Sequence, residues 1–140
     1  MRHLYFAYGM NTNPGEMARR CPSSRPLGEA YLDGYRFVFR GHADVELADR
    51  EDHVVGVLWD IDDRDLEALD VLEGFPDYYL RQRVRVEHKG REHIAWVYTM
   101  EDQSFKSDPH QAYFDMCLEG YKFFDLETQQ LHGALNNVIS

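Results

Sequence analysis

Cysteine, long apolar runs and positive charge are all scarce in this sequence. Cys21 and Cys117 are its two cysteines, and neither belongs to a CxxC or Cys/His spacing, so neither a disulfide framework nor a zinc site is indicated. No apolar run approaches the roughly 18 residues that a membrane-spanning helix needs, and no signal-peptide pattern opens the chain. These absences predict a cytoplasmic protein with free thiols and no membrane partner.

Acidic residues clearly outnumber basic ones. Fifteen Lys plus Arg against 25 Asp plus Glu give a formal net charge of −10, which repels phosphate backbones and anionic membranes. The densest basic stretch includes Arg81, Arg83 and Arg85, whose alternation would direct all three to one solvated side of a strand. We therefore predict no nucleic-acid partner.

Metal and cofactor motifs are also absent. Of the seven histidines only His88 and His93 look paired, flanking a predicted turn with no HExxH spacing, so we expect an exposed cross-strand pair. Nothing resembles GxGxxG, which argues against a dinucleotide-binding fold. Cys117 lies among apolar and aromatic residues and is expected in the core. The prediction is a protein without metal or cofactor.

The chain is long enough for one proper core. Its 140 residues are 44% hydrophobic and 14% aromatic, and no repeat, linker or low-complexity tract divides them, so residues 1–140 are predicted to form a single domain. The apolar patterns and turn signals are typical of mixed strands and helices. Expected strands cover 3–7, 28–32, 35–39, 54–59, 79–87 and 92–100, and expected helices cover 15–20, 62–74, 109–124 and 126–138.

Two hairpins are expected among these strands. Asp33-Gly34 is a turn candidate that would pair 28–32 with 35–39, and the turn at 88–91 would pair 79–87 with 92–100. The polar and acidic segment 41–53 is expected to be a loop or an irregular edge strand.

The segment from Leu4 to Asn11 is an apolar, aromatic strand that runs directly into a glycine turn before a helix. Because glycine lacks a Cβ, Gly9 can take a turn that other residues resist and can leave peptide N–H groups open beside a ligand. An ordinary turn between a strand and a helix accounts for the same residues, and the spacing alone favours that interpretation.

Glu73 is the most unusual single residue, because it ends the predicted 62–74 helix, where the helix dipole disfavours a carboxylate. A carboxylate pushed toward its neutral form acquires the raised pKa that suits a general base near neutrality. The alternative is a solvated glutamate on a frayed helix end. Phe75, Tyr78 and Tyr79 follow at once, and a folded-back loop would desolvate Glu73.

Taken together, these segments resemble the gamma-glutamylcyclotransferase-like family. The similarity includes residues 5–11, 55–59 and 69–74, then Tyr79, Arg81, Pro109, Tyr113 and Gly120, in the same order along most of the chain. The resemblance implies an α+β fold, a small mixed β-barrel flanked by helices, with a pocket between the Tyr8-Gly9 turn and the end of the 62–74 helix.

The resemblance also implies a reaction on a small-molecule γ-glutamyl substrate. The free α-amine attacks the γ-carbonyl, releases an amine or amino acid and closes 5-oxoproline, with no metal or cofactor. Glu73 would be the catalytic acid/base, and Tyr79 and Tyr113 would supply pocket hydroxyls. The resemblance also implies that the backbone of residues 5–10 holds the glutamyl carboxylate and the polarised carbonyl. The substrate-binding residues that it implies in this segment are Tyr5, Phe6, Ala7, Tyr8, Gly9, Met10 and Asn11.

Met10 departs from the family pattern, which usually has serine at this position. The backbone N–H survives the change, but the hydroxyl is lost and a bulky thioether takes its place. A second hypothesis therefore stays open beside the enzyme, namely a catalytically idle pocket protein that binds a small acidic or amide ligand or modulates a partner.

Overall fold

The computed structural model describes residues 1–139 and contains a closed five-stranded barrel in the order β1-β5-β2-β6-β7. β1 pairs with β7 in parallel, and the other barrel pairs are antiparallel. The fold is therefore α+β with a mixed barrel, as the family resemblance implied. The barrel strands are β1 (Arg2–Ala7), β2 (Arg25–Asp33), β5 (His53–Asp62), β6 (Tyr79–His88) and β7 (Arg91–Met100).

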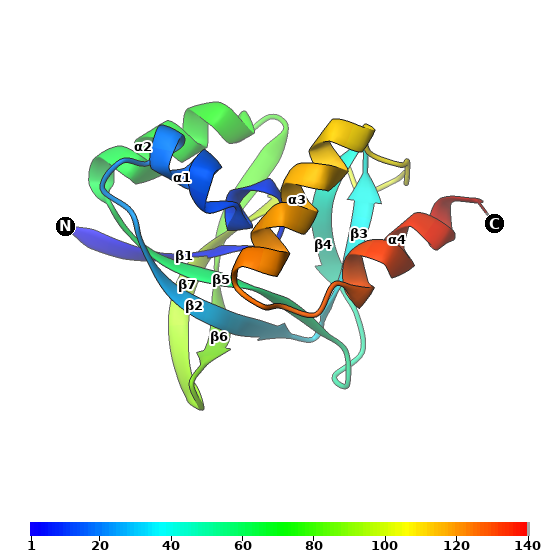
Figure 1. Cartoon of the computed structure of the whole chain (residues 1–140), viewed down its shortest axis with the longest axis horizontal. Helices are drawn as coiled ribbons and strands as arrows, with labels where there is room; N and C mark the ends of the chain where they lie inside the picture. Colours follow the sequence, from blue (N-terminus) through cyan, green and yellow to red (C-terminus); the bar gives the residue numbers. More distant parts are fainter. Residues whose placement is uncertain (140) are drawn as a thin grey trace.

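Helices pack around this barrel (Figure 1). A short 3₁₀ helix, η1 (Met10–Thr12), leads from β1 into α1 (Pro14–Arg20), and α2 (Asp63–Glu73) lies beside α1. α3 (Gln111–Phe123) and α4 (Gln129–Ile139) complete the described chain, and α3 packs against η1. Within the described residues, every helix is too short or too polar to cross a membrane.

α2 has the boundaries that its sequence predicted. Asp62 accepts a hydrogen bond from the Asp65 N–H, and the Asp65 side chain accepts one from the Asp62 N–H, which forms a capping box. Gly74 ends the helix at φ 67°, a left-handed conformation that favours glycine. These two ends place Glu73 in the last turn, directly before the loop into β6.

The predicted hairpin of 28–32 with 35–39 is wrong. β2 stays in the barrel between β5 and β6, whereas β3 (Tyr35–Arg40) pairs with β4 (His42–Leu47) in a separate two-stranded sheet. Gly34 does form a turn, at φ 79°, but the chain leaves the barrel there instead of folding back on β2.

Of the two expectations for segment 41–53, a loop or an irregular edge strand, the edge strand holds for β4, which is one of the two strands in its sheet. This segment looked too acidic for a buried strand, yet Asp44 is fully buried because Arg40 donates to it at 2.7 Å. A buried carboxylate is tolerated when a cation and hydrogen-bond donors surround it.

The second predicted hairpin is confirmed, since β6 and β7 pair along ten residues each. His88 and His93 approach one another across it, with ring centroids 6.1 Å apart, although both are only partly exposed. The prediction of three solvated arginines holds for Arg83 and Arg85 but not for Arg81, which is partly buried. Cys117 is buried, as expected.

Candidate active site

A cavity of about 220 Å³ lies between the turn that follows β1 and the C-terminal end of α2. It is large enough for a small molecule, and several separate parts of the sequence meet at it. The residues that line it are Tyr5, Tyr8, Gly9, Met10, Asn11, Arg20, His42, Ala43, Leu72, Glu73, Tyr78, Tyr79, Tyr98 and Tyr113.

The turn at Gly9 needs glycine because of space. Its φ is −117°, outside the left-handed region, so the expected conformational reason does not apply. A Cβ at Gly9 would lie 2.7 Å from the Ala43 Cβ and 3.3 Å from the Tyr113 hydroxyl, closer than carbon atoms normally approach. Glycine therefore allows β4 and α3 to press against the turn.

The same turn leaves peptide donors without partners. The first hydrogen bonds of η1 run from Thr12 N–H to Gly9 C=O at 3.1 Å and from Asn13 N–H to Met10 C=O at 3.0 Å. The N–H groups of Gly9, Met10 and Asn11 precede these bonds, as at any helix start, and donate to no acceptor among the described residues. Such groups can bind an oxyanion or a carboxylate.

Helix α3 supports this turn from behind. A Cβ at Gly120 would lie 2.2 Å from the Thr12 hydroxyl oxygen, so only glycine permits this packing. At the next residue, the Tyr121 hydroxyl donates to the Tyr8 carbonyl at 2.5 Å. The turn is thus fixed by residues more than 100 positions away in the sequence.

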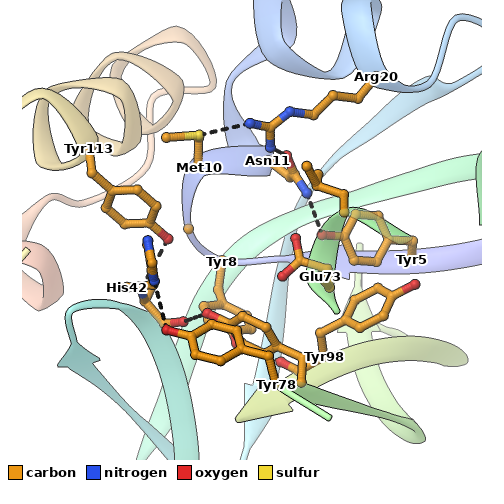
Figure 2. A pocket seen from close by; sticks show the side chains of 14 residues that line it. Tyr5, Tyr8, Met10, Asn11, Arg20, His42, Glu73, Tyr78, Tyr98 and Tyr113 are labelled. Carbon is orange, nitrogen blue, oxygen red and sulfur yellow. Dashed lines mark hydrogen bonds between the residues drawn. The ribbon is translucent and has the colours of Figure 1, made fainter. Parts of the chain in front are cut away.

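Glu73 projects from the end of α2 among the side chains of the cavity (Figure 2). It is partly buried, and its carboxyl group makes no hydrogen bond within the described part of the chain. Burial raises the pKa of Glu73 to about 7, and the Arg20 charge opposes this rise. Desolvation, rather than the helix dipole, is therefore the main cause of the shift.

The tyrosines around the cavity differ in whether their hydroxyl protons are engaged. Tyr8, Tyr79 and Tyr98 donate to the Tyr98 carbonyl, the Ala43 carbonyl and the Asp70 carboxylate at 2.5, 2.7 and 2.7 Å. In contrast, Tyr5 and Tyr113 accept hydrogen bonds, from the Asn11 amide at 3.1 Å and from the Ala43 N–H at 3.0 Å. Their hydroxyl protons remain available to a bound molecule.

The wall that contains Tyr98 is held by a charged network. Asp70 accepts from the Tyr98 hydroxyl and, with its other oxygen, from Arg81 at 2.6 Å. The Arg81 guanidinium also stacks on Trp96 at 4.4 Å from the ring centroid. This explains why Arg81 is partly buried rather than solvated.

His42 lies at the opposite side of the cavity from this network. Its Nδ1 is 2.9 Å from the Tyr78 hydroxyl, and its ring packs edge-on against Tyr113 with centroids 5.0 Å apart. Burial lowers the pKa of His42, so the ring is neutral at physiological pH. The His42 ring is therefore an uncharged part of the cavity lining and does not add a second positive charge beside Arg20.

The structure brings most of the predicted site residues together, with two exceptions. Tyr5, Tyr8 to Asn11, Glu73, Tyr79 and Tyr113 all line the cavity. Phe6 and Ala7 do not, because both are buried in the core of the barrel. Side chains alternate along β1, so Phe6 points to the face opposite Tyr5. Ala7 shares the face of Tyr5 but does not line the cavity.

Sequence reasoning did not find Arg20, His42 or Tyr98. The signal for Arg20 was its position at the end of the helix that follows the Gly9 turn, which returns its side chain toward that turn. His42 lay in the segment expected to be a loop or an irregular edge strand, which gave its side chain no predicted direction. Among the described residues, no group of three or more His, Cys, Asp or Glu is arranged to hold a metal ion.

Comparison with known proteins agrees with this architecture. The sequence profile of the family described as "Gamma-glutamyl cyclotransferase, AIG2-like" matches residues 5–117, which is most of the chain and includes every segment of the cavity. The chain belongs to this family. The match rests on sequence, independently of the geometry described above.

Individual relatives support the same assignment. A protein of Methanocaldococcus jannaschii named "Putative gamma-glutamylcyclotransferase MJ1514" is 31% identical over 83 residues, which cover 50% of this chain and 69% of that protein. A solved structure named "Gamma-glutamyl cyclotransferase" superposes with a TM-score of 0.86 at 24% identity, over 96% of this chain and 86% of the other. An AIG2-like protein from Mus musculus has a TM-score of 0.61 at 19% identity, over 71% and 78% of the two chains. The two structures show the shared fold alone.

Proposed function

We propose that this protein is a gamma-glutamyl cyclotransferase that converts a γ-glutamyl amide or γ-glutamyl amino acid into 5-oxoproline and a free amine. The observation that supports this most strongly is the Glu73 carboxyl group, with a pKa near 7, in the same cavity as the open peptide donors of the Gly9 turn. We also propose that the whole chain works as one domain and needs no cofactor.

In the proposed mechanism, Glu73 handles the protons. An α-ammonium group is not a nucleophile until it loses a proton, and a carboxylate with a pKa near neutrality can accept that proton. The freed amine attacks the γ-carbonyl carbon and a C–N bond forms. Glu73 passes its proton to the leaving nitrogen as the bond from that nitrogen to the carbon breaks. Glu73 then accepts the second proton, which the ring nitrogen loses to become a lactam N–H, and releases it to the departing amine, so that no water is consumed.

The Gly9 turn would stabilise charge on the carbonyl oxygen. Peptide N–H groups that are already oriented do not need to reorganise as negative charge develops, and such donors often make the largest electrostatic contribution. The hydroxyls of Tyr5 and Tyr113 can add donors because their protons are not engaged. Ring closure is intramolecular, so the substrate itself supplies proximity.

Met10 favours a second candidate, an idle pocket protein of the same fold. Its side chain lines the cavity, where the family pattern usually has serine, and it contacts Arg20 at 3.2 Å through its sulfur. A cavity narrowed in this way could retain a ligand without turning it over.

One assay separates the two candidates. The protein is incubated with a panel of γ-glutamyl amines and γ-glutamyl dipeptides, and 5-oxoproline is measured by mass spectrometry. Formation of 5-oxoproline from at least one compound is the expected result. Tight binding of these compounds without any 5-oxoproline would support the idle pocket protein instead.

A further inference from the structure

A positive and a negative side chain face the same cavity, and only the negative one has a role so far. Arg20 ends α1, and its guanidinium group reaches the cavity beside Met10 and Asn11 (Figure 2). Arg20 is the one lysine or arginine among the lining residues of the described chain, and its side chain is 20% exposed. The positive charge of Arg20 lowers the pKa of Glu73 and so opposes part of the rise that burial causes.

The protein partners of Arg20 satisfy it incompletely. One terminal nitrogen donates to the Asn11 side-chain oxygen at 2.7 Å, and the other donates to the Met10 thioether sulfur at 3.2 Å, a weak acceptor. The nearest carboxylate, Glu16, lies 3.2 Å from Arg20 but is bound by Arg19 through both oxygens at 2.7 Å. Arg20 therefore keeps hydrogen-bonding capacity on the cavity side.

We propose that Arg20 binds the α-carboxylate of the substrate's glutamyl group, so that Arg20 and Glu73 together select a ligand with an α-amino acid head group. This inference rests on the proposed function and assigns it a specificity residue. In such a head group the ammonium and the carboxylate share one carbon, so a cavity with one cation and one carboxylate matches both charges. A ligand with only one of them leaves a partly buried charge without a partner, which is costly.

Met10 fits this role as a replaceable partner of Arg20. A carboxylate is a charge-assisted acceptor and is much stronger than a thioether, so it displaces Met10 from the guanidinium nitrogen. Methionine is flexible and tolerates such a displacement. The unusual residue at position 10 then holds Arg20 in place without competing strongly with substrate.

The test uses two ligands that differ in the carboxylate alone. L-γ-Glutamylanilide carries it, and 4-aminobutyranilide lacks it. Their dissociation constants are measured by calorimetry on the Glu73→Gln protein, in which turnover is expected to be at least about 100-fold slower, with and without Arg20→Met. Loss of a charge-assisted hydrogen bond is expected to weaken binding of the first ligand by roughly 10- to 100-fold and of the second by about 2-fold or less.

Arg19→Met is the matched control. It removes the same charge from the neighbouring position of the same helix and also releases Glu16, but Arg19 is 67% exposed and does not line the cavity. The released Glu16 already lies 3.2 Å from Arg20 when Arg19 is present, so it should add only a small weakening of the carboxylate-bearing ligand. The dissociation constants of Arg19→Met should stay within about 3-fold of the parent, well short of the change caused by Arg20→Met. Arg20→Lys retains the charge without the planar fork and should lie between Arg20→Met and the parent.

Three results would overturn the inference. Equal weakening of both ligands by Arg20→Met would show that Arg20 only supports the turn. If Arg19→Met weakened binding of the carboxylate-bearing ligand as much as Arg20→Met does, the cause would be a general charge effect. If Arg20→Met does not fold, an unaltered ligand preference in Arg20→Lys has the same meaning. Where binding is too weak for calorimetry, aniline release by proteins with native Glu73 gives the same comparison as a ratio of kcat/KM.

These outcomes are distinct from failure of the proposed function. If the native protein cyclises γ-glutamylanilide but shows no dependence on Arg20 that is specific to the carboxylate, the inference alone is wrong. If the native protein neither binds nor cyclises this ligand or the γ-glutamyl panel, the proposed function fails and the inference fails with it.

Discussion

Glu73 and Asp44 are both carboxylic acids removed from water, and they differ in what surrounds them. Asp44 is fully buried and accepts hydrogen bonds from Arg40, the Met100 N–H and the Gln103 amide at 2.7, 2.9 and 3.0 Å. Glu73 has no such partner within the described residues and faces a cavity. Burial raises the pKa of each, but only Asp44 has donors that hold its charge in place.

The contrast separates a structural acid from an acid that can exchange a proton. A carboxylate surrounded by fixed donors stabilises its neighbours and cannot readily release them, because each would lose a partner. A carboxyl group without partners can take up a proton from a ligand and return it. The same distinction divides the tyrosines, since Tyr79 donates to a fixed carbonyl whereas Tyr5 keeps its proton.

The largest expected effect comes from Glu73→Gln. The amide has nearly the same shape but cannot accept the ammonium proton, so kcat should fall by roughly 10²- to 10⁴-fold on any substrate that the native protein cyclises. The measurement is the initial rate of 5-oxoproline formation. Native rates in this variant would end the proposed role of Glu73 and would make Tyr5 and Tyr113 the next candidates.

Asp44→Asn should act on stability. The variant removes one of the two carboxylates that pair with Arg40, Glu46 being the other, and weakens the acceptor for the Met100 N–H, so the free energy of unfolding should fall by about 2 kcal/mol. Urea unfolding followed by circular dichroism measures this. A loss below about 1 kcal/mol would mean that the network around Asp44 is not the structural element described here.

The pH dependence of stability gives a third test. The pKa of Glu73 rises from 4.5 when exposed to about 7 in the folded protein, so the folded state prefers the protonated form. The contribution of Glu73 to stability is therefore full below pH 4.5 and is lost as pH rises through 7, and Glu73→Gln, which cannot ionise, does not show this loss at any pH. The variant should equal the native protein near pH 4 and exceed it by about 1–3 kcal/mol at pH 8, measured by urea unfolding. A difference independent of pH would contradict the assigned shift.

The smallest expected effect distinguishes Tyr5 from Tyr79. Tyr5→Phe removes a hydroxyl whose proton is available to substrate, so kcat should fall by roughly 3- to 10-fold, the worth of one neutral hydrogen bond. Tyr79→Phe removes a donor to the Ala43 carbonyl and should lower the free energy of unfolding by about 1 kcal/mol, with a smaller effect on kcat. If Tyr79→Phe lowered kcat more than Tyr5→Phe does, and Tyr5→Phe lowered stability more, then the hydrogen bond made by a tyrosine's hydroxyl proton would not predict whether that tyrosine acts in catalysis or in stability.

Local sequence signals predicted the parts of the molecule that local interactions build. The capped helix α2, the β6–β7 hairpin and the Gly9 turn all follow from nearby residues, and with them the position of Glu73 next to a loop. The family resemblance then supplied the barrel, whose strand order no local pattern contains.

The β4 side of the cavity shows where such signals end. Its acidic sequence suggested a loop or an irregular edge strand and gave no sign of a buried carboxylate, because Arg40, the partner that allows Asp44 to be buried, becomes recognisable only when β3 and β4 are paired. Ala43 then binds Tyr79 and Tyr113 from two distant elements through its backbone. Contacts of this kind depend on the fold and leave no spacing in the sequence.

The most direct test of the account is the pH dependence of kcat/KM for a γ-glutamyl substrate of the native protein. If Glu73 is the general base, activity should rise with pH as its carboxyl group ionises, with the midpoint of the acid limb near 7. An acid limb with its midpoint near 4.5, or a profile that is flat between pH 5 and 8, would contradict the claim that burial prepares Glu73 for proton transfer.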